Sequence, residues 1–548
     1  MYTELIKSSA SYSLAVRIFV ILHDICMIYI TKPDSQTTVS QDNYPVISYD
    51  LKVRLVISAH RMALLLLVLL FGTSVVVACI TKNTYDGGDS IYHYLFAHYA
   101  LQHPENLLNA WAKPLFTLLA TLPAQGGFLG MKLFQCVVVA VSSWLTYRIA
   151  RHFQLPWPAL AIVFCYGAPD YFRIQFSGLT EPLFGLILVG AVFLALANRP
   201  YWSVSLISWL PFVRSEGVLM LGIWGLYMIW QRQWRTLPLL LLGYAIYSIM
   251  GGIFLGDFAW LFTNNPYSFH SQYGHGRWLH FLEHVPTLLG WVLTLLYIAG
   301  GVRTVRRALI PTQWSGRLFR TELLLVHGSI VVFISAQSAF WALGLFGSFG
   351  MTRVLTVLTP LFAVAALSGL AWLSQLTPEP TGRRWSMVGT IAALIFMLFS
   401  RDHGFVNDGG GLIGYHSNLH WRRDFQQLTD LQLADKATKW LRGHDSHWAW
   451  HPLAFEHTYY AVALNIDLFD PTIRPSLTRN WSPYLDGIPS GTYVFWDGWF
   501  CPVEAHIPLD MLEKDSRFKK LWQDSIPMYP DMPNYIHYKA AIFEKTRL

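Results

Sequence analysis

Long apolar runs separated by short polar segments occupy most of this chain. The first clear run, residues 62–80, has nineteen residues and no charged side chain. An α-helix rises about 1.5 Å per residue and the hydrocarbon layer of a membrane is about 30 Å thick, so such a run fits one membrane-spanning helix. The same length rule predicts about eleven spans in total. These spans cover residues 62–80, 128–147, 156–168, 178–197, 202–230 (two spans), 237–255, 285–302, 323–343, 354–373 and 387–399.

The apolar stretch 202–230 is too long for one straight span and is interrupted by the sequence PFVRSEG. Basic residues flank it on both sides, with Arg199 before it and Arg232 after it. Because basic flanks stay on the cytoplasmic side, the stretch must cross the membrane an even number of times. We therefore predict two short helices, with Arg214 and Glu216 at the outer turn or at depth inside the protein. Charged residues within a membrane segment indicate a functional site.

The basic residues predict the side of the membrane on which each loop lies. Lys52, Arg54 and Arg61 precede the first span, so this span runs from the cytoplasmic side to the outer side. The loop 303–320 carries five arginines, which is the strongest cytoplasmic signal in the chain. Following the spans in order places the loop after residue 80 and the C-terminal tail outside.

The last part of the chain, residues 401–548, is polar, rich in Trp and Asp, and has no predicted span. The patterns at 437–444 and 508–522 predict helices, and TYVFWDG predicts a strand. The fold class predicted from the sequence is thus an all-α polytopic membrane protein over 61–400, followed by a small mixed α/β extramembrane domain over 401–548.

The composition supports this class. Hydrophobic residues make up 53% of the chain and charged residues 13%, whereas a soluble domain carries about 25% charged residues. The formal net charge of +7 comes mostly from basic residues in short loops, where they set orientation, so nucleic acid is not an expected partner. Residues 1–60 are interpreted as an N-terminal extension: an interfacial helix, a weak span or a segment without a role.

Unusual polar residues gather on the predicted outer side, whereas the cytoplasmic loops carry little except arginine. The stretch 85–114 holds Asp86 and Asp89 on either side of a Gly-Gly pair, followed by aromatic residues, histidines and Lys113. A transporter would also place polar groups near the membrane midplane. The pattern instead indicates an outward-facing site over a hydrophobic body. Its candidate residues are Asp86, Asp89, Tyr92, His93, Lys113, Asp170, Arg173, Glu181, Arg214, Glu216, His270, Tyr273, His275, Arg277 and Arg353.

A substrate with a lipid tail and a charged head fits such a site. Its tail would lie among the helices, and Arg or Lys would hold a phosphate head by charge-assisted hydrogen bonds. A carboxylate would accept the proton of an attacking hydroxyl. We find no nucleotide-binding glycine motif, so the donor itself must supply the energy. A lipid-phosphate sugar meets these requirements.

Four motifs extend this reading: GGDSIYHY at 87–94, WAKP at 111–114, GLTEPLFG at 178–185 and PFVRSEG at 211–217. Together they resemble the GT-C superfamily of membrane glycosyltransferases, including its mannosyltransferase-like members, over most of the region 60–400. The resemblance implies a GT-C fold, a polyprenyl-phosphate sugar donor and a bacterial inner membrane with the site on the periplasmic side. The family often pairs two adjacent acids in its first outer loop, whereas here Ser90 follows Asp89 and the second acid lies upstream.

The resemblance and the chemistry together assign catalytic roles. Asp89 is the predicted catalytic base; as an alternative it would only cap the following helix. Asp86 is the second catalytic candidate, or a turn residue before the Gly-Gly pair. Arg214, Lys113 and Arg353 are assigned to the donor phosphate. Their alternatives are, in that order, a structural ion pair, a solvated loop lysine and a helix-end cap.

The remaining candidates are assigned to substrate binding. Glu181 and Glu216 would position the substrate, or else favour a helix dipole and complete an ion pair. The other residues of this group are Asp170, Arg173, Tyr92, His93, His270, Tyr273, His275 and Arg277; the histidine-rich loop among them is also typical of plain polar surface. In the tail, Asp497, Trp499 and Glu504 could bind a sugar, but a folded aromatic core is the favoured interpretation. No cofactor or metal site is expected, because the spacing of the candidate residues matches no common pattern of metal ligands. A divalent metal is kept as an alternative.

Two other functions compete with a glycosyltransferase. A lipid-linked sugar flippase would need polar residues facing both sides of the membrane. An O-antigen ligase or polymerase-like enzyme would also use a large outer loop, but with a pyrophosphate-linked donor. The acceptor of the predicted transfer is a glycan, a lipid or a protein.

Overall fold

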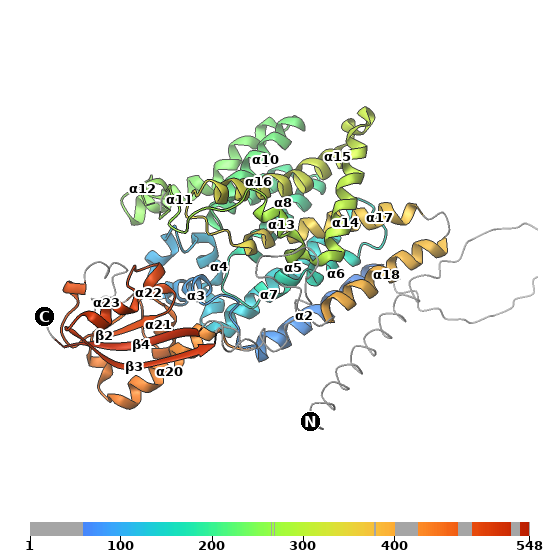
Figure 1. Cartoon of the computed structure of the whole chain (residues 1–548). Helices are drawn as coiled ribbons and strands as arrows, with labels where there is room; N and C mark the ends of the chain where they lie inside the picture. Colours follow the sequence, from blue (N-terminus) through green and yellow to red (C-terminus); the bar gives the residue numbers. More distant parts are fainter. Residues whose placement is uncertain are drawn as a thin grey trace, which may run out of the picture.

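The computed structural model shows a long helical body with a small sheet domain at one end (Figure 1). It describes residues 59–264, 266–267, 269–376, 380–399, 426–469, 485–527 and 537–546. The predictions made for residues 1–58 lie outside the described residues.

The body is built from apolar helices. Among the described residues, six helices are long and apolar enough to cross a membrane. They are α2 (Ala59–Ile80), α5 (Gly127–His152), η4 with α11 (Trp234–Leu241, Leu242–Phe254), α14 (Val285–Ala308), α15 with η6 and α16 (Arg317–Thr321, Glu322–Gly328, Ser329–Ala342), and η7 with α17 (Thr352–Leu358, Thr359–Gln375). Further helices of the body are α4 (Pro114–Ala124), α6 (Leu160–Gly167), α8 (Glu181–Leu196), α9 (Pro200–Ile207), α10 (Gly217–Trp230) and α18 (Pro380–Phe399).

A polytopic helical fold is therefore observed, but the predicted number of about eleven spans is not confirmed. Several apolar runs form shorter helices than their length suggests. The run 156–168 is one example, because α6 ends at Gly167 before Pro169, which starts the separate helix α7 (Pro169–Ile174). The predicted interruption of 202–230 is present: α9 ends at Ile207, a single 3₁₀ turn, η3 (Leu210–Phe212), follows, and α10 starts at Gly217.

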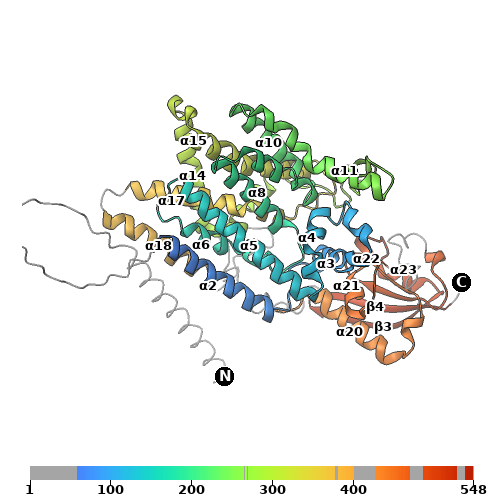
Figure 2. The same ribbon diagram turned by 180° about the vertical axis from the view of Figure 1, so that it is seen from behind.

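Helix α17 lies at the centre of the body. In an 18-residue stretch of this span, 94% of the residues are buried, against 17% in α2. Figures 1 and 2 show α17 running among α14, α5 and α6, with α2 on the outside. Both helices are apolar, with mean hydropathies of 2.8 for α2 and 2.1 for the span that contains α17. They differ in surroundings: α17 packs against protein, whereas α2 presents most of its surface outward, as expected for a lipid-facing helix.

The C-terminal domain contains a four-stranded sheet with the order β1-β2-β4-β3. Strand β1 (Leu453–Phe455) runs parallel to β2 (Tyr493–Asp497), and β4 (His537–Lys545) runs antiparallel to both β2 and β3 (Phe518–Pro527). The helices of this domain are α20 (Thr429–His444), α21 (Tyr459–Leu464), α22 (Phe500–Val503) and α23 (Leu509–Lys514). The predicted mixed α/β domain is thus present in the described part of the tail.

Two of the three local predictions for this domain are confirmed, since α20 includes 437–444 and β2 lies within TYVFWDG. The helix predicted over 508–522 is wrong beyond α23. Residues from Phe518 onward form β3 because they pair with β4 along nine positions, and this long-range pairing overrides the local helical pattern.

The C-terminal domain lies at the end of the body formed by α3 (Asp89–His98) and α4, far from α15 (Figures 1 and 2). His103 contacts Asp467 of the domain at 2.8 Å.

Near the C-terminal end of α14, buried Glu322 contacts Arg303 at 2.7 Å and Arg307 at 2.5 Å. A buried carboxylate therefore pairs with two of the five arginines in the loop 303–320, which is predicted to lie on the cytoplasmic side.

Candidate active site

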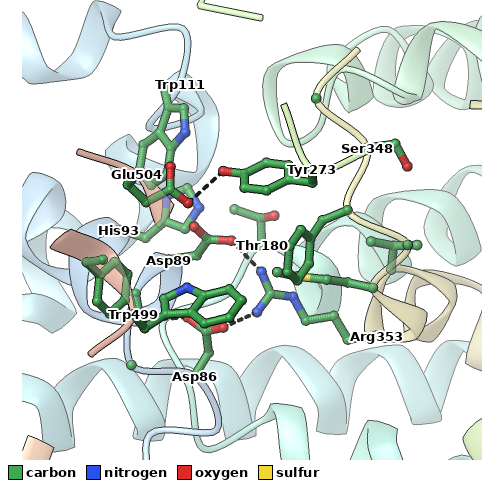
Figure 3. A pocket seen from close by; sticks show the side chains of 18 of the residues that line it. Asp86, Asp89, His93, Trp111, Thr180, Tyr273, Ser348, Arg353, Trp499 and Glu504 are labelled. Atoms are coloured by element: carbon green, nitrogen blue, oxygen red, sulfur yellow. Dashed lines mark hydrogen bonds and ion pairs between the residues drawn. The ribbon is translucent and has the colours of Figure 1, made fainter. Parts of the chain in front are cut away.

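A cavity of about 1330 Å³ lies between the helical body and the C-terminal domain. Its walls come from the loop after α2, the start of α10, the segment after α16, and the C-terminal domain (Figure 3). The structure brings eight of the predicted residues to this cavity although they are far apart in sequence. They are Asp86, Asp89, His93, Lys113, Arg214, Glu216, Tyr273 and Arg353.

Arg353, in η7, holds both carboxylates of the first loop. One of its terminal nitrogens contacts Asp86 and the other contacts Asp89 (Figure 3). Asp86 Oδ1 also accepts hydrogen bonds from the backbone N–H groups of Gly88 at 2.9 Å and Ser90 at 3.3 Å. Asp86 therefore caps the start of α3, the role considered for Asp89. Asp89 is the first residue of α3, and 43% of its side chain is exposed, so it is the more available carboxylate.

A second charged group lies beside the first. Arg214 contacts Glu181 at 2.9 Å and Glu216 at 3.0 Å. Glu181 is fully buried and also lies 3.6 Å from Arg353 Nε, so it links the two arginines. Gln337 donates to Glu216 at 3.0 Å. Since the carboxylates of this network surround both arginines, much of the arginine charge is already balanced within the protein.

Lys113 differs from both arginines. Its Nζ donates to Tyr267 Oη at 2.6 Å, to Ser215 Oγ at 3.1 Å and to the Ala110 carbonyl at 3.3 Å. These three partners are neutral oxygens. Lys113 is 7% exposed and has a φ of +66°, which costs a non-glycine residue free energy. A buried ammonium in a strained backbone position is suited to meet an anion from outside the protein.

His93 forms part of the wall beside these charges. Its ring stacks on Trp111 with a centroid distance of 4.8 Å and an interplanar angle of 19°. Burial, followed by the positive charges of Lys113, Arg214 and Arg353, lowers the pKa of His93 to about 3. His93 is therefore neutral at physiological pH and adds no further positive charge to the cavity.

The first loop and the GLTEPLFG motif hold each other in place. The Gly178 backbone N–H donates to Ser90 Oγ at 2.7 Å, and Ser90 Oγ donates to the Thr84 carbonyl at 2.9 Å. A Cβ added to Gly178 would collide with the backbone carbonyl of Ser90. Glycine is required here because the two backbones touch. The contact fixes the start of α8, where Glu181 reaches the arginine that holds the two aspartates.

The C-terminal domain supplies the facing wall. Glu504 accepts a hydrogen bond from Tyr273 at 2.8 Å (Figure 3) and another from Gln272 at 3.0 Å. Trp499 also lines the cavity and is 40% exposed. The favoured interpretation of Trp499 and Glu504 as part of a folded aromatic core is therefore wrong. Asp497 is 1% exposed and does lie inside the domain.

The other predicted residues stand outside the cavity wall. Glu181 lies behind it in contact with both arginines, as described above. Asp170 pairs with Arg173 at 3.4 Å, and Arg277 pairs with Glu283 at 2.5 Å near the protein surface. Tyr92, His270 and His275 likewise do not line the cavity. Their assignment to substrate binding, like that of Asp170, Arg173 and Arg277, stays a prediction.

Several residues of the site were not predicted because they are neutral. Thr180 accepts from Arg214 at 3.3 Å, and Ser215, Tyr267 and Gln337 contact Lys113 or Glu216. Thr180 and Ser215 adjoin predicted acids in the sequence, which is the one signal that points to them. Gln337 lies inside an apolar helix, where a buried amide next to a site has no distinct pattern.

No group of three or more His, Cys, Asp or Glu side chains that could hold a metal ion occurs within the described ranges. The independence of the site from metals and cofactors stays a prediction.

The fold of the chain is similar to that of solved protein structures. No family model and no curated protein matches its sequence. Two similar solved structures are of ArnT from Cupriavidus metallidurans. The form bound to undecaprenyl phosphate is 10% identical, with a TM-score of 0.56, over 88% of this chain and 98% of that chain. The apo form is 11% identical, with a TM-score of 0.53, over the same shares. At such identities the likeness is one of fold.

Proposed function

We propose that this protein transfers a sugar from a polyprenyl phosphate to an acceptor hydroxyl at the outer face of the membrane. The observation that carries the proposal is one cavity that holds an available carboxylate, Asp89, together with a buried cation that has neutral partners, Lys113. Two further observations support it: the resemblance of the motifs to GT-C glycosyltransferases, and the likeness of fold to ArnT, one structure of which is bound to undecaprenyl phosphate.

Asp89 acts as the base in the proposed reaction. It takes the proton of the acceptor hydroxyl while that oxygen attacks the anomeric carbon of the donor sugar. The bond between this carbon and the phosphate oxygen breaks, and polyprenyl phosphate leaves with the bonding electron pair. Direct attack inverts the configuration of the anomeric carbon. Arg353 holds Asp89 in place beside Asp86.

Lys113 is the proposed contact of the leaving phosphate. The negative charge on the phosphate grows as the sugar leaves, and a cation already fixed in place stabilises that charge. Arg214 and Arg353 were also assigned to the phosphate from the sequence. Their carboxylate partners favour a positioning role instead, because a phosphate would have to displace those partners.

The proposed setting is a bacterial inner membrane, with the cavity and the C-terminal domain on the periplasmic side. The basic loops of the sequence and the family resemblance support this orientation. Mannose, another hexose or a pentose is the proposed donor sugar, and a glycan, lipid or protein is the proposed acceptor.

A transfer assay with purified full-length protein in detergent tests the proposal. Radiolabelled polyprenyl-phosphate sugars and, in a separate arm, pyrophosphate-linked glycans are offered with crude membranes as the acceptor. Transfer from a monophosphate donor supports the proposal and identifies the sugar. Transfer from the pyrophosphate arm alone would indicate a ligase or polymerase. Movement of lipid-linked sugar across reconstituted vesicles without any transfer would indicate a flippase.

A further inference from the structure

One wall of the cavity comes from the C-terminal domain and has no part in the proton transfer or the phosphate contact. It includes Trp499 and Phe500, which follow β2, and Glu504, which follows α22. Trp499 is a large apolar side chain that remains 40% exposed inside a cavity. Its ring meets Phe349 at 6.0 Å and 84°, so this contact covers at most one face of the indole.

A nearby tryptophan shows how the same strand supplies the domain core. Trp496 is 5% exposed, and its indole N–H donates to the Ile507 carbonyl at 2.8 Å. Trp496 therefore has the burial and the hydrogen bond expected of a structural tryptophan. Trp499, three positions later, points into the cavity instead (Figure 3). Packing of the domain core explains Trp496 but not the exposure of Trp499.

The backbone around Trp499 is fixed before any ligand arrives. Buried Asp497 accepts hydrogen bonds through Oδ1 from the backbone N–H of Trp499 at 2.9 Å and of Phe500 at 2.6 Å. The same oxygen accepts from Tyr538 Oη at 2.9 Å. Three donors on one carboxylate oxygen tie the loop to both β2 and β4. Such support is what a preorganised binding residue needs.

Hydrogen-bond acceptors line the same cavity as the indole. Each Glu504 oxygen accepts one hydrogen bond from the loop that carries Gln272 and Tyr273, and a carboxylate has about four acceptor positions. Burial, then the hydrogen bond to Glu504 and, last, the negative charge of Asp89 raise the pKa of the Tyr273 phenol. The wall thus combines an open aromatic face with carboxylates at its rim.

A sugar ring is complementary to this combination. One face of the ring exposes C–H groups, whose slight positive charge suits the negative face of an indole. Its rim carries hydroxyl groups, which donate hydrogen bonds to carboxylates. We propose that Trp499 and Glu504 form a saccharide subsite, in which a sugar ring stacks on Trp499 and hydroxyls donate to Glu504. The ring belongs either to the donor sugar or to an acceptor glycan. The position of the subsite in a reaction rests on the proposed function, but sugar binding itself does not require transfer.

Saturation-transfer NMR on the full-length protein in detergent tests the subsite without an activity assay. The probes are methyl glycosides of mannose, glucose, galactose and arabinose. We expect at least one glycoside to receive saturation from wild type and to lose it in Trp499→Ala, with partial retention in Trp499→Phe. Trp450→Ala is the matched control, because Trp450 is an 82% exposed tryptophan of the same domain outside the cavity wall. No signal with wild type, or an equal signal in Trp499→Ala, would overturn the subsite.

Kinetics then distinguish the two sources of the sugar. If the ring is that of the donor, Trp499→Ala raises the KM of the donor about tenfold. If it is that of an acceptor glycan, the same substitution raises the KM of the acceptor and leaves that of the donor unchanged. Glycoside binding that depends on Trp499, without transfer from any donor, would keep the subsite and reject the proposed function. If a folded Trp499→Ala protein transfers the sugar with the KM of the donor and the KM of the acceptor both unchanged, the proposed function is kept and the subsite is rejected.

Discussion

At the scale of single residues, the cations of the cavity differ in what they face. Arg353 and Arg214 each contact carboxylates, whereas the hydrogen bonds of Lys113 go to neutral oxygens. A phosphate that approaches the arginines would have to displace carboxylates that contact them, whereas one that approaches Lys113 would replace only neutral hydrogen-bond partners. Residue type alone ranks an arginine above a lysine for phosphate binding, and the contacts reverse that order here.

Replacing Lys113 by methionine should weaken donor binding while the protein stays folded. The substitution keeps most of the apolar stem and removes the charge, and a hydrogen bond to a charged group contributes about 1.5–3 kcal/mol. We therefore expect the donor KM to rise by about tenfold to a hundredfold, measured in the transfer assay. Lys132→Met is the control, because Lys132 is also buried and donates to the Thr81 carbonyl at 2.9 Å outside the cavity. An equal rise in both variants would argue against a phosphate contact at Lys113.

His93 predicts how acid affects the site. Its pKa is about 3 in the folded protein, against 6.5 for an ordinary histidine. Between these values the unfolded chain binds a proton that the folded protein does not, so stability falls as the pH drops below about 6.5, by about 1.4 kcal/mol per unit. Thermal unfolding in detergent between about pH 5 and pH 7 should therefore show a smaller loss on acidification in His93→Gln than in wild type. Identical pH profiles would contradict the assignment of a neutral buried His93.

At the scale of elements, the site depends on the contact between the start of α3 and the segment before α8. Gly178 touches Ser90 backbone to backbone, and Glu181 at the start of α8 then reaches Arg353 and Arg214. Asp89 is the first residue of α3 and Glu181 is the first residue of α8. The contact between Gly178 and Ser90 therefore fixes how far apart these two carboxylates lie.

Gly178→Ala should destabilise the protein, because its Cβ would collide with the Ser90 carbonyl. Overpacking against a backbone that cannot move freely costs about 1–3 kcal/mol. Gly222→Ala in α10 is the matched control: nothing lies within 4 Å of a Cβ there, and alanine is the better helix former. Thermal unfolding of the two variants in the same detergent compares them. A Gly178→Ala protein as stable as Gly222→Ala would show that the two backbones are not in contact.

The elements also show which parts of the fold a sequence can predict. The interruption at PFVRSEG was predictable because a proline, charges and a glycine occur together inside an apolar run. The lengths of the helices were less predictable, since hydropathy does not show where a run such as 156–168 is shortened by a neighbouring proline. Strand β3 could not be predicted, because Phe518–Pro527 becomes a strand through pairing with β4. The sequence of one segment does not show which distant segment it pairs with.

At the scale of the whole molecule, the cavity exists only between two parts of the chain. The motifs of the body predicted Asp89 and Lys113 in the charged wall, and the predicted outer side of the membrane added Arg353. The opposite wall was not predictable, because Trp499 and Glu504 look like ordinary residues of a small domain until that domain docks. The sequence predicts only a turn at the Gly-Gly pair. In the structure a Cβ at Gly87 would collide with Asp430 of α20, so this glycine also permits the close contact with the C-terminal domain.

The most direct test of the account compares wild type with Asp89→Asn in the transfer assay, using the polyprenyl-phosphate sugar that wild type accepts. Asparagine keeps the size of the side chain but cannot take the proton of the acceptor. We expect thermal unfolding close to that of wild type and a transfer rate lower by about 10²- to 10⁴-fold. A folded Asp89→Asn protein that transfers the sugar at the wild-type rate would contradict the proposed mechanism.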